Sequence, residues 1–201
     1  MESLRSFLQY FNEQAQALHK EVTEASWMAQ TTGDAKWAAT LSEVSTKYSL
    51  LYASKEKFEQ AQQYLALAEG NEVEMRQLQL LVNAMKGKQL PEELIADLSK
   101  RSSELNLLFN TYIPEIDGQK YSANDIRNVL SNSKDNILRE KVWKASKEVG
   151  QVVEQDLLAL IKKRNEAARL LGYDNHHQMG FELQELNRDE IFKLFNELID
   201  Q

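Results

Sequence analysis

The chain contains no cysteine, and it has only 2 prolines and 7 glycines among its 201 residues. Without cysteine there is no disulfide framework, no thiolate metal site and no cysteine nucleophile. Proline and glycine are the residues that most often interrupt helices, and long stretches of this sequence lack both. The sequence therefore predicts a mostly helical, all-α chain.

Long apolar runs and an excess of positive charge are also missing. No apolar run approaches the roughly 20 residues that a membrane-spanning helix needs. The N-terminus lacks the basic stretch followed by an apolar core that marks a signal peptide. The net charge of -7 argues against a nucleic-acid partner, because phosphates are bound by a basic face. We expect a cytoplasmic protein with no membrane and no nucleic acid among its partners.

The first part of the chain carries apolar side chains at steps of three and four residues, which is typical of amphipathic helices. The first pattern spans residues 4–29 and ends at Gly33, and Asp34 is a suitable N-cap for the next helix. The second pattern continues without a break over residues 37–68. Two long helices joined by a short turn predict an antiparallel, lid-like hairpin over residues 1–70.

Residues 71–130 are predicted to form connecting helices. We expect one helix over residues 72–86 with Val73 on its buried side. A further helix is expected to start with Pro91 in its first turn and to run to about Tyr112.

Loop chemistry marks the end of this region. Asp117-Gly118 is a turn signal that can close a small hairpin, and Ser122 with Asp125 resembles a capping box at the start of a short helix.

Residues 134–201 are predicted to contain a long central helix and two shorter C-terminal helices. Gly172 follows the last periodic residue, where a left-handed cap is needed, and Asn187 can cap the last helix. The apolar positions of the central helix that we expect to share one face are Val142, Ala145, Val149, Val152, Val153, Leu157, Leu160, Ile161, Ala168 and Leu171. The three tryptophans, Trp27, Trp37 and Trp143, are interpreted as core anchors.

The three histidines, His19, His176 and His177, do not form a recognisable metal motif. A zinc peptidase needs His-Glu-x-x-His on one helix face, and neither Glu nor a second His stands at that spacing here. Adjacent His176 and His177 point in different directions on a helix. We interpret them as surface or half-buried residues near a turn, with an Asp174/His177 metal site as the weaker alternative.

Six residues are candidates for a structural or substrate-channel role: Trp37, Arg164, Glu166, Arg169, Tyr173 and His177. Arg164, Glu166 and Arg169 could form a buried ion network that holds the turn at Gly172. Trp37 could form part of a substrate wall. No residue is assigned a catalytic or metal-binding role.

Several segments carry a resemblance to a known family: Val142-Trp143-Lys144-Ala145, Val149-Gly150, Arg164-Asn165-Glu166-Ala167-Ala168-Arg169 and Gly172-Tyr173. Together they resemble the angiotensin-converting-enzyme-like zinc dipeptidyl carboxypeptidases, and more loosely the oligoendopeptidase F and thimet oligopeptidase group. Further similar pieces follow the order of the family: Ala25-Ser26-Trp27 with Thr31-Thr32, Leu90-Pro91, and Leu194-Phe195-Asn196-Glu197-Leu198. The resemblance therefore extends over nearly the whole chain.

The resemblance implies an all-helical fold in which two lobes flank a deep channel, with the N-terminal lobe supplying lid helices and one channel wall. It also implies zinc as the cofactor of the full-length enzyme, short peptides as substrates, and a C-terminal catalytic portion as the partner of this lobe. Animal members carry a chloride-binding arginine shortly after the Gly-Tyr turn. Residues 178–182 contain no arginine, so chloride activation is not expected.

We therefore expect residues 1–201 to form a single helical lobe of a zinc metallopeptidase, truncated inside the last apolar pattern and inactive alone. The exposed apolar face of such a lobe should favour homo-oligomers. The alternative that remains open is a stand-alone helical module that binds peptides or a protein partner without catalysis.

Overall fold

A computed structural model describes residues 3–67 and 69–201. The predicted all-α fold is confirmed, with one short hairpin as the only strand structure in these ranges. The elements in chain order are α1 (Leu4–Thr32), α2 (Ala35–Ala53), α3 (Lys55–Leu67), α4 (Glu72–Lys86), α5 (Glu92–Thr111), β1 (Glu115–Ile116), β2 (Gln119–Lys120), α6 (Ala123–Asn132), α7 (Asn136–Lys147), α8 (Val149–Leu170), α9 (His176–Leu183) and α10 (Arg188–Ile199).

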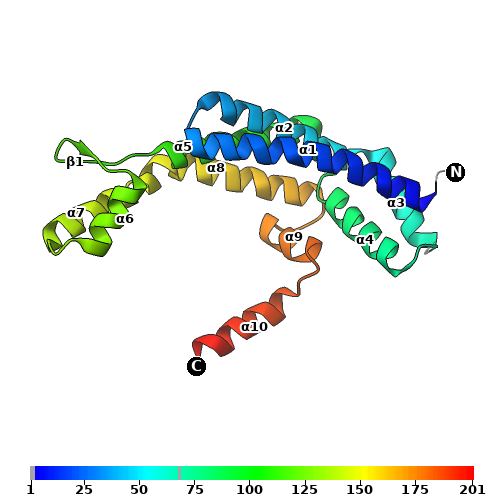
Figure 1. Cartoon of the computed structure of the whole chain (residues 1–201). Coiled ribbons are helices and arrows are strands. Elements are labelled where there is room, and N and C mark those ends of the chain that lie inside the picture. Colours follow the sequence, from blue (N-terminus) through cyan, green and yellow to red (C-terminus); the bar gives the residue numbers. More distant parts are fainter. Residues whose placement is uncertain (1–2, 68) are drawn as a thin grey trace.

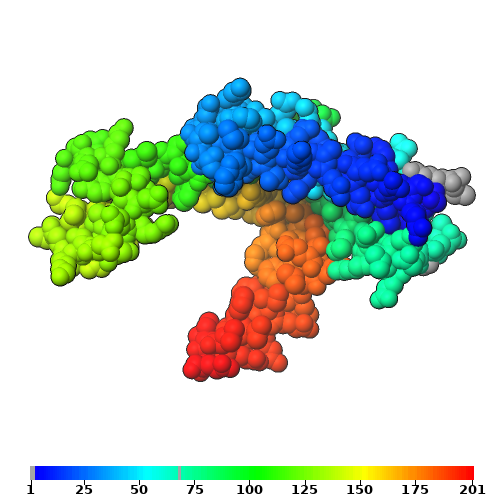
Figure 2. Space-filling model, viewed as in Figure 1, coloured from blue at the N-terminus to red at the C-terminus, as the bar shows by residue number. Residues whose placement is uncertain are grey.

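Helices α1, α2, α5 and α8 form the main body of the molecule (Figure 1). The contacts run in sequence, with α1 on α2, α2 on α5 and α5 on α8. The α3–α4 pair lies at one end of this body, and the β1–β2 hairpin with α6 and α7 lies at the other. Helices α9 and α10 leave its underside, and α10 stands away from the rest (Figure 2).

Some of the buried apolar residues form three clusters, and others, such as Val44, Ile95 and Leu160, are buried in the main body outside them. The first joins α1 to α3 and α4 and contains Phe7, Leu8, Phe11, Ala61, Leu78, Val82 and Met85. The second lies beside the hairpin and contains Ile116, Val142 and Ala145. The third holds α9 against the end of α8 and contains Ala168, Tyr173 and Met179. The core is therefore distributed along an elongated chain of helices.

Several predicted helix ends are confirmed. Gly33 ends α1 with a left-handed φ of 66°, and the Asp34 side chain accepts a hydrogen bond from the backbone N–H of Lys36. Gly172 adopts a φ of 86° after α8. Pro91 is different: it precedes α5 as the N-cap residue, since the helix begins at Glu92.

The predicted hairpin and capping box are also present. Asp117 and Gly118 have φ values of 52° and 80°, which is the left-handed pair that a two-residue turn between antiparallel strands requires. The Ser122 hydroxyl accepts from the Asp125 N–H, and the Asp125 carboxylate accepts from the Ser122 N–H. These two features orient α6 at the end of the molecule.

The prediction of one unbroken helix over residues 37–68 is wrong. The helix ends at Ala53, and Ser54 has an extended ψ of 111°. The Ser54 hydroxyl accepts a hydrogen bond from the Lys57 N–H and so begins α3. This break allows α3 to pack on α4. Ala68, the last residue of the predicted pattern, lies outside the described residues.

The long central helix is also divided. Glu148 separates α7 from α8, and its N–H donates to the carbonyl of Ala145, three residues earlier. This tighter turn interrupts the regular α-helical pattern just before Gly150, which is a weak helix former. The helix pattern was correct on both sides, but its continuity was not.

Some residues predicted to be buried are exposed. Trp27 and Trp143 are 68% and 52% exposed, so they are not core anchors, and Val73 is 66% exposed. On α8, Val152, Leu157 and Ile161 are exposed, whereas Val153 and Leu160 are buried. The apolar stripe of α8 is wider than the surface that α5 covers. In the described ranges, no helix combines the length and apolar character that crossing a membrane requires.

The backbone at Gly172 generates a matched pair of predictions. Gly172→Ala should lower the free energy of unfolding by about 1 kcal/mol, because a side chain at positive φ is strained. Gly150→Ala should instead raise it by about 0.5 kcal/mol, because Gly150 is helical and open space surrounds its Cβ position. Urea denaturation measures both. Equal effects of the two changes would contradict the assigned role of Gly172.

Candidate functional site

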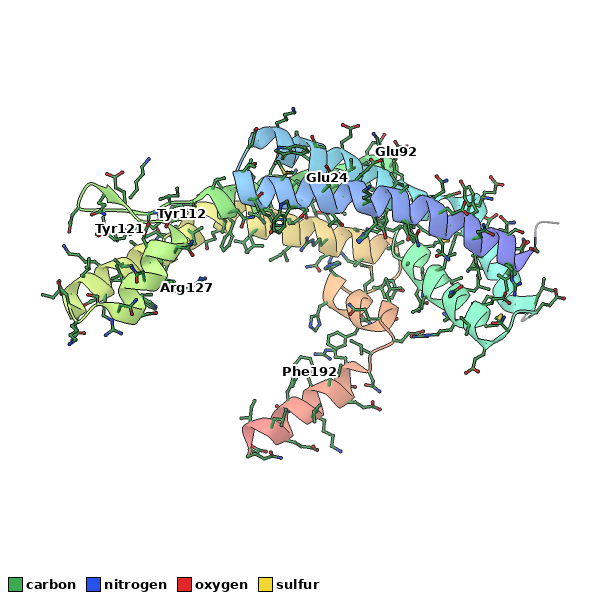
Figure 3. The ribbon with its side chains drawn as sticks, viewed as in Figure 1. Glu24, Glu92, Tyr112, Tyr121, Arg127 and Phe192 are labelled. Atoms are coloured by element: carbon green, nitrogen blue, oxygen red, sulfur yellow. The ribbon has the colours of Figure 1, made fainter. Side chains whose placement is uncertain are left out.

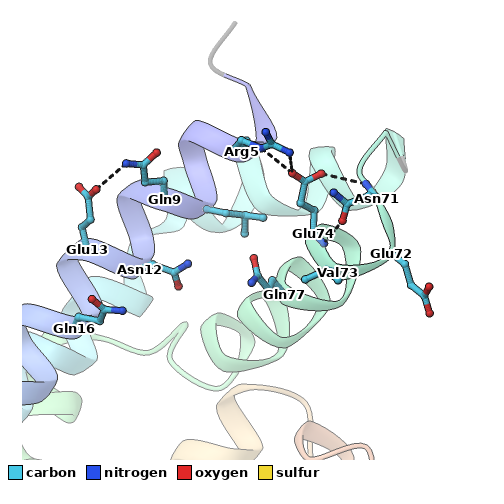
Figure 4. Close-up of a pocket in the computed structure, with 11 residues that line it drawn as sticks. Arg5, Gln9, Asn12, Glu13, Gln16, Asn71, Glu72, Val73, Glu74 and Gln77 are labelled. Atoms are coloured by element: carbon cyan, nitrogen blue, oxygen red, sulfur yellow. Dashed lines mark hydrogen bonds and ion pairs between the residues drawn. The ribbon is translucent and has the colours of Figure 1, made fainter.

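A polar groove lies between α1 and the start of α4 (Figure 4). Its volume is about 650 Å³. The side contributed by α1 carries Arg5, Leu8, Gln9, Asn12, Glu13 and Gln16, and the side contributed by α4 carries Asn71, Glu72, Val73, Glu74 and Gln77. The buried Leu8 is part of the first core cluster, so the groove lies directly over a packed core.

An ion pair joins the two sides at one end of the groove. The Arg5 guanidinium lies 2.9 Å from Glu74 Oε1. Glu74 also accepts from the Asn71 N–H in the capping box that begins α4. The hydrogen bond from the Asn71 backbone, followed by that from Arg5, lowers the pKa of Glu74. The carboxylate is therefore held ionised and fixed at the helix start.

Side-chain amides dominate the rest of the groove. Gln9, Asn12 and Gln16 recur along α1 opposite Gln77 of α4 (Figure 4). The Gln9 amide donates to Glu13 Oε1 at 2.9 Å. Each amide offers both donors and an acceptor, which match the N–H and C=O groups of an extended peptide backbone. The arrangement suits peptide binding.

The sequence-based reasoning did not identify this groove. A signal was present in the spacing of Gln9, Asn12 and Gln16, which lie three and four residues apart and therefore share one face of α1. The opposing face of α4 could not be found in the same way, because the contact between α1 and α4 is tertiary.

The candidate residues from the sequence do not gather in one place. Trp37 is half-buried near the start of α2, with the Lys36 ammonium 5.9 Å from its ring centroid. Arg164 lines an inner cavity, whereas His177 lines separate hollows beside α9. Their proposed role in a substrate channel stays a prediction.

The buried ion network of Arg164, Glu166 and Arg169 is absent from the described chain. Glu166 is exposed and pairs with Lys163 at 2.9 Å. Arg164 donates to the Ser102 hydroxyl of α5 at 3.1 Å. Arg169 is exposed and contributes only by lowering the pKa of Glu166, after the larger effect of Lys163. Arg164 and Glu166 point to different sides of α8 because they are two positions apart. Glu166 and Arg169 are three apart and share the exposed side, away from Ser102.

Tyr173 and His177 have packing roles. Tyr173 is buried in the third core cluster, and its hydroxyl has no hydrogen-bond partner among the described residues. The His177 ring packs edge-on against Phe181 and Phe192, with centroids 4.9 and 6.4 Å away. Phe192 lies at the start of α10, on its side toward α9 (Figure 3).

The donor set does not fit a zinc ion. Across residues 3–67 and 69–201, no three His, Cys, Asp or Glu side chains are placed to hold a metal. His176 and His177 serve different surroundings, since His176 lines the inner cavity and His177 packs on two phenylalanines. The weaker alternative of an Asp174/His177 site therefore has no third ligand.

The ion pair at the end of the groove makes stability depend on pH. The pKa of Glu74 is lowered in the folded state, so its contribution is present above the ordinary glutamate pKa of about 4.3 and is lost as the pH falls below it. The Tm difference between wild type and Glu74→Gln should therefore be largest near neutral pH and should shrink in acid. Glu72→Gln is the control, because Glu72 lies in the same first turn of α4 but does not pair with Arg5. A Tm difference independent of pH would contradict this account.

Comparison with known proteins places the chain in a family. The profile of the angiotensin-converting enzyme family matches residues 1–201, the whole length of the chain. A search of curated proteins finds no match. The resemblance carried by the short sequence motifs is thus confirmed, and the all-helical architecture agrees with it. The chain belongs to the angiotensin-converting enzyme family.

Proposed function

We propose that this chain forms the helical lobe that covers the peptide channel of a zinc metallopeptidase acting on short peptides. The observation that carries the proposal is the family match over residues 1–201. Proteins of this family are peptidases, so a peptidase-related role follows for the chain.

We place the zinc ligands and the general base outside these 201 residues. The sequence contains three histidines, and none begins a His-Glu-x-x-His motif. Zinc is therefore proposed as the cofactor of the full-length enzyme, held by residues of another portion. The role of the present lobe is to admit, hold and shield a peptide.

The groove between α1 and α4 supports this role. Its amides can hydrogen-bond to an extended backbone without regard to sequence, which suits an enzyme that accepts many short peptides. A hairpin of long helices beside such a groove would exclude folded chains by size. Gating of this kind sets substrate length without taking part in the chemistry.

Uncovered apolar surfaces support a partner. The exposed apolar residues of α8 and α10 are Val152, Leu157, Leu158, Ile161, Leu170, Phe192, Leu194, Phe195, Leu198 and Ile199. In the described structure no residue of α10 is buried. We propose that the catalytic portion of the peptidase covers these faces, and that a second copy of the chain does so when that portion is absent.

The alternative function is a stand-alone helical module that binds peptides or a protein partner without catalysis. The amide-lined groove favours it equally, because peptide binding there needs no zinc. The coding sequence distinguishes the two functions. A reading frame that continues past Gln201 and encodes His-Glu-x-x-His would support the peptidase function.

The 201-residue protein should not hydrolyse a quenched fluorescent peptide when zinc is added, because it supplies no zinc motif. Metal analysis after dialysis should find less than one zinc per chain. A buffer blank and an unrelated active zinc peptidase serve as controls. Metal-dependent turnover by the pure protein with bound zinc would refute the proposal.

The same protein should associate with itself, since the uncovered faces expose large apolar side chains. Light scattering at high concentration should give a mass above the 23.2 kDa of one chain. Phe195→Asp with Leu198→Asp should lower that mass, whereas Lys193→Asp, which places the same charge elsewhere on α10, should not. A monomer at all concentrations would show that these faces do not associate.

A further inference from the structure

A second cavity, partly open to solvent, lies between α1, α2, α5, α8, α9 and the link from α4 to α5. Its volume is about 570 Å³, within the range of small-molecule sites. Six serine side chains and Asn106 line it, together with Lys88, Arg164 and His176. No aspartate or glutamate is among its lining residues. A cavity lined by an arginine and a lysine but by no carboxylate has no negative side chain to balance its positive groups.

The positive groups are held in place by the fold. Arg164 donates to Ser102 Oγ at 3.1 Å, which ties the guanidinium of α8 to α5. The backbone N–H of His176 donates to Asn165 Oδ1 at 2.9 Å, which fixes the start of α9. Throughout the described chain, neither Lys88 nor Arg164 has an ion pair with a carboxylate.

Lys88, Arg164 and His176 line the same cavity, and the first two affect the electrostatic surroundings of His176. Burial, then the charges of Arg164 and Lys88, lower the pKa of His176. Burial also lowers the pKa of Lys88. Like charges that are partly removed from water repel each other, so an anion among them would be stabilised.

Free hydroxyl groups add hydrogen-bond donors to the cavity. Ser49 and Ser103 are 8% and 5% exposed. Within the described ranges their side chains, and those of Ser45 and Ser99, make no hydrogen bond to another residue. Each hydroxyl can rotate to donate to an oxygen placed in the cavity.

The remaining wall is apolar. Val22, Leu41, Leu90, Ile95, Leu98 and Met179 surround the polar groups. An inorganic ion would leave this wall in contact with water, whereas an organic anion would cover it. The lining therefore matches a molecule with one oxyanion head and a short apolar body.

We propose that this cavity binds a small organic carboxylate, with its head among Arg164, Lys88 and His176 and its apolar body against the leucine-lined wall. The buried serines donate to the carboxylate oxygens beside the cations. The inference does not depend on the proposed peptidase role, because every residue of the site belongs to the described part of this chain: Lys88 and Leu90 lie in the link between α4 and α5, and the other named residues lie on helices.

Hexanoate is a suitable probe, with hexanamide as its neutral counterpart of similar size. At constant ionic strength, hexanoate should titrate to saturation in an NMR experiment and shift the amide signals of residues 49, 103 and 176. Hexanamide and inorganic phosphate should each bind about tenfold more weakly than hexanoate. Hexanamide lacks the negative charge, and phosphate lacks the apolar body. Chloride at the same concentration should not displace hexanoate.

Two substitutions with a matched control test the assignment. Arg164→Gln should weaken hexanoate binding about tenfold, the loss expected for one charge-assisted hydrogen bond. Lys162→Gln, which removes an exposed charge from the same helix, should leave the dissociation constant within about twofold. Lys88→Met provides a second variant if Arg164→Gln does not fold, as judged by circular dichroism.

Three results would overturn the proposal. The first is the absence of saturable binding of hexanoate by the folded protein. The second is equal binding of hexanamide, which would mean that the cavity selects only apolar volume. The third is an equal loss in Lys162→Gln and Arg164→Gln, which would mean that net charge acts at a distance and not through contact.

Discussion

Burial of Phe7 and Phe11 beneath α3 and α4 is the interaction on which the N-terminal half depends. Phe7 is fully buried and its ring lies 5.3 Å from that of Phe11, in a cluster with Leu78 and Met85. Residues nearly eighty positions apart are joined there. Replacing such a phenylalanine with alanine costs about 3–5 kcal/mol in a packed core. The groove between α1 and α4 exists because this cluster brings the two helices together.

The molecule separates its polar and apolar surfaces in an unusual way. A globular domain buries apolar faces and exposes polar ones. Here serines and cations line a cavity that is only partly open to solvent, whereas Leu157, Phe195 and Leu198 are exposed on the surface. Polar groups that are removed from water without a hydrogen-bond partner cost free energy, and large exposed apolar patches promote association. A ligand inside and a partner outside would compensate for each, and this links the two proposals without making either depend on the other.

The sequence-based predictions were correct for features set by neighbouring residues and wrong for features set by contacts between distant helices. Helix ends set by neighbours in sequence, such as the turn at Gly33 and the capping box of Ser122, were found because their chemistry is local. The break at Glu148 was missed, since the glycine beside it, Gly150, is also tolerated inside a continuous helix and does not by itself predict a break. Trp27 is exposed and Arg164 lines a cavity because of the way the helices pack against one another. The periodicity of a sequence does not show which helices contact each other.

The link between α9 and α10 has its own consequence. Glu185 lies in this link at a φ of 59°, an uncommon conformation for a residue with a side chain. Its carboxylate pairs with Arg76 of α4 at 2.6 Å, so an ion pair offsets the backbone strain. Both side chains are partly open to water, so dissolved salt weakens the attraction between them. One of the contacts that hold the start of α10 near α4 is therefore sensitive to ionic strength, whereas the backbone hydrogen bonds within the helices on either side are not.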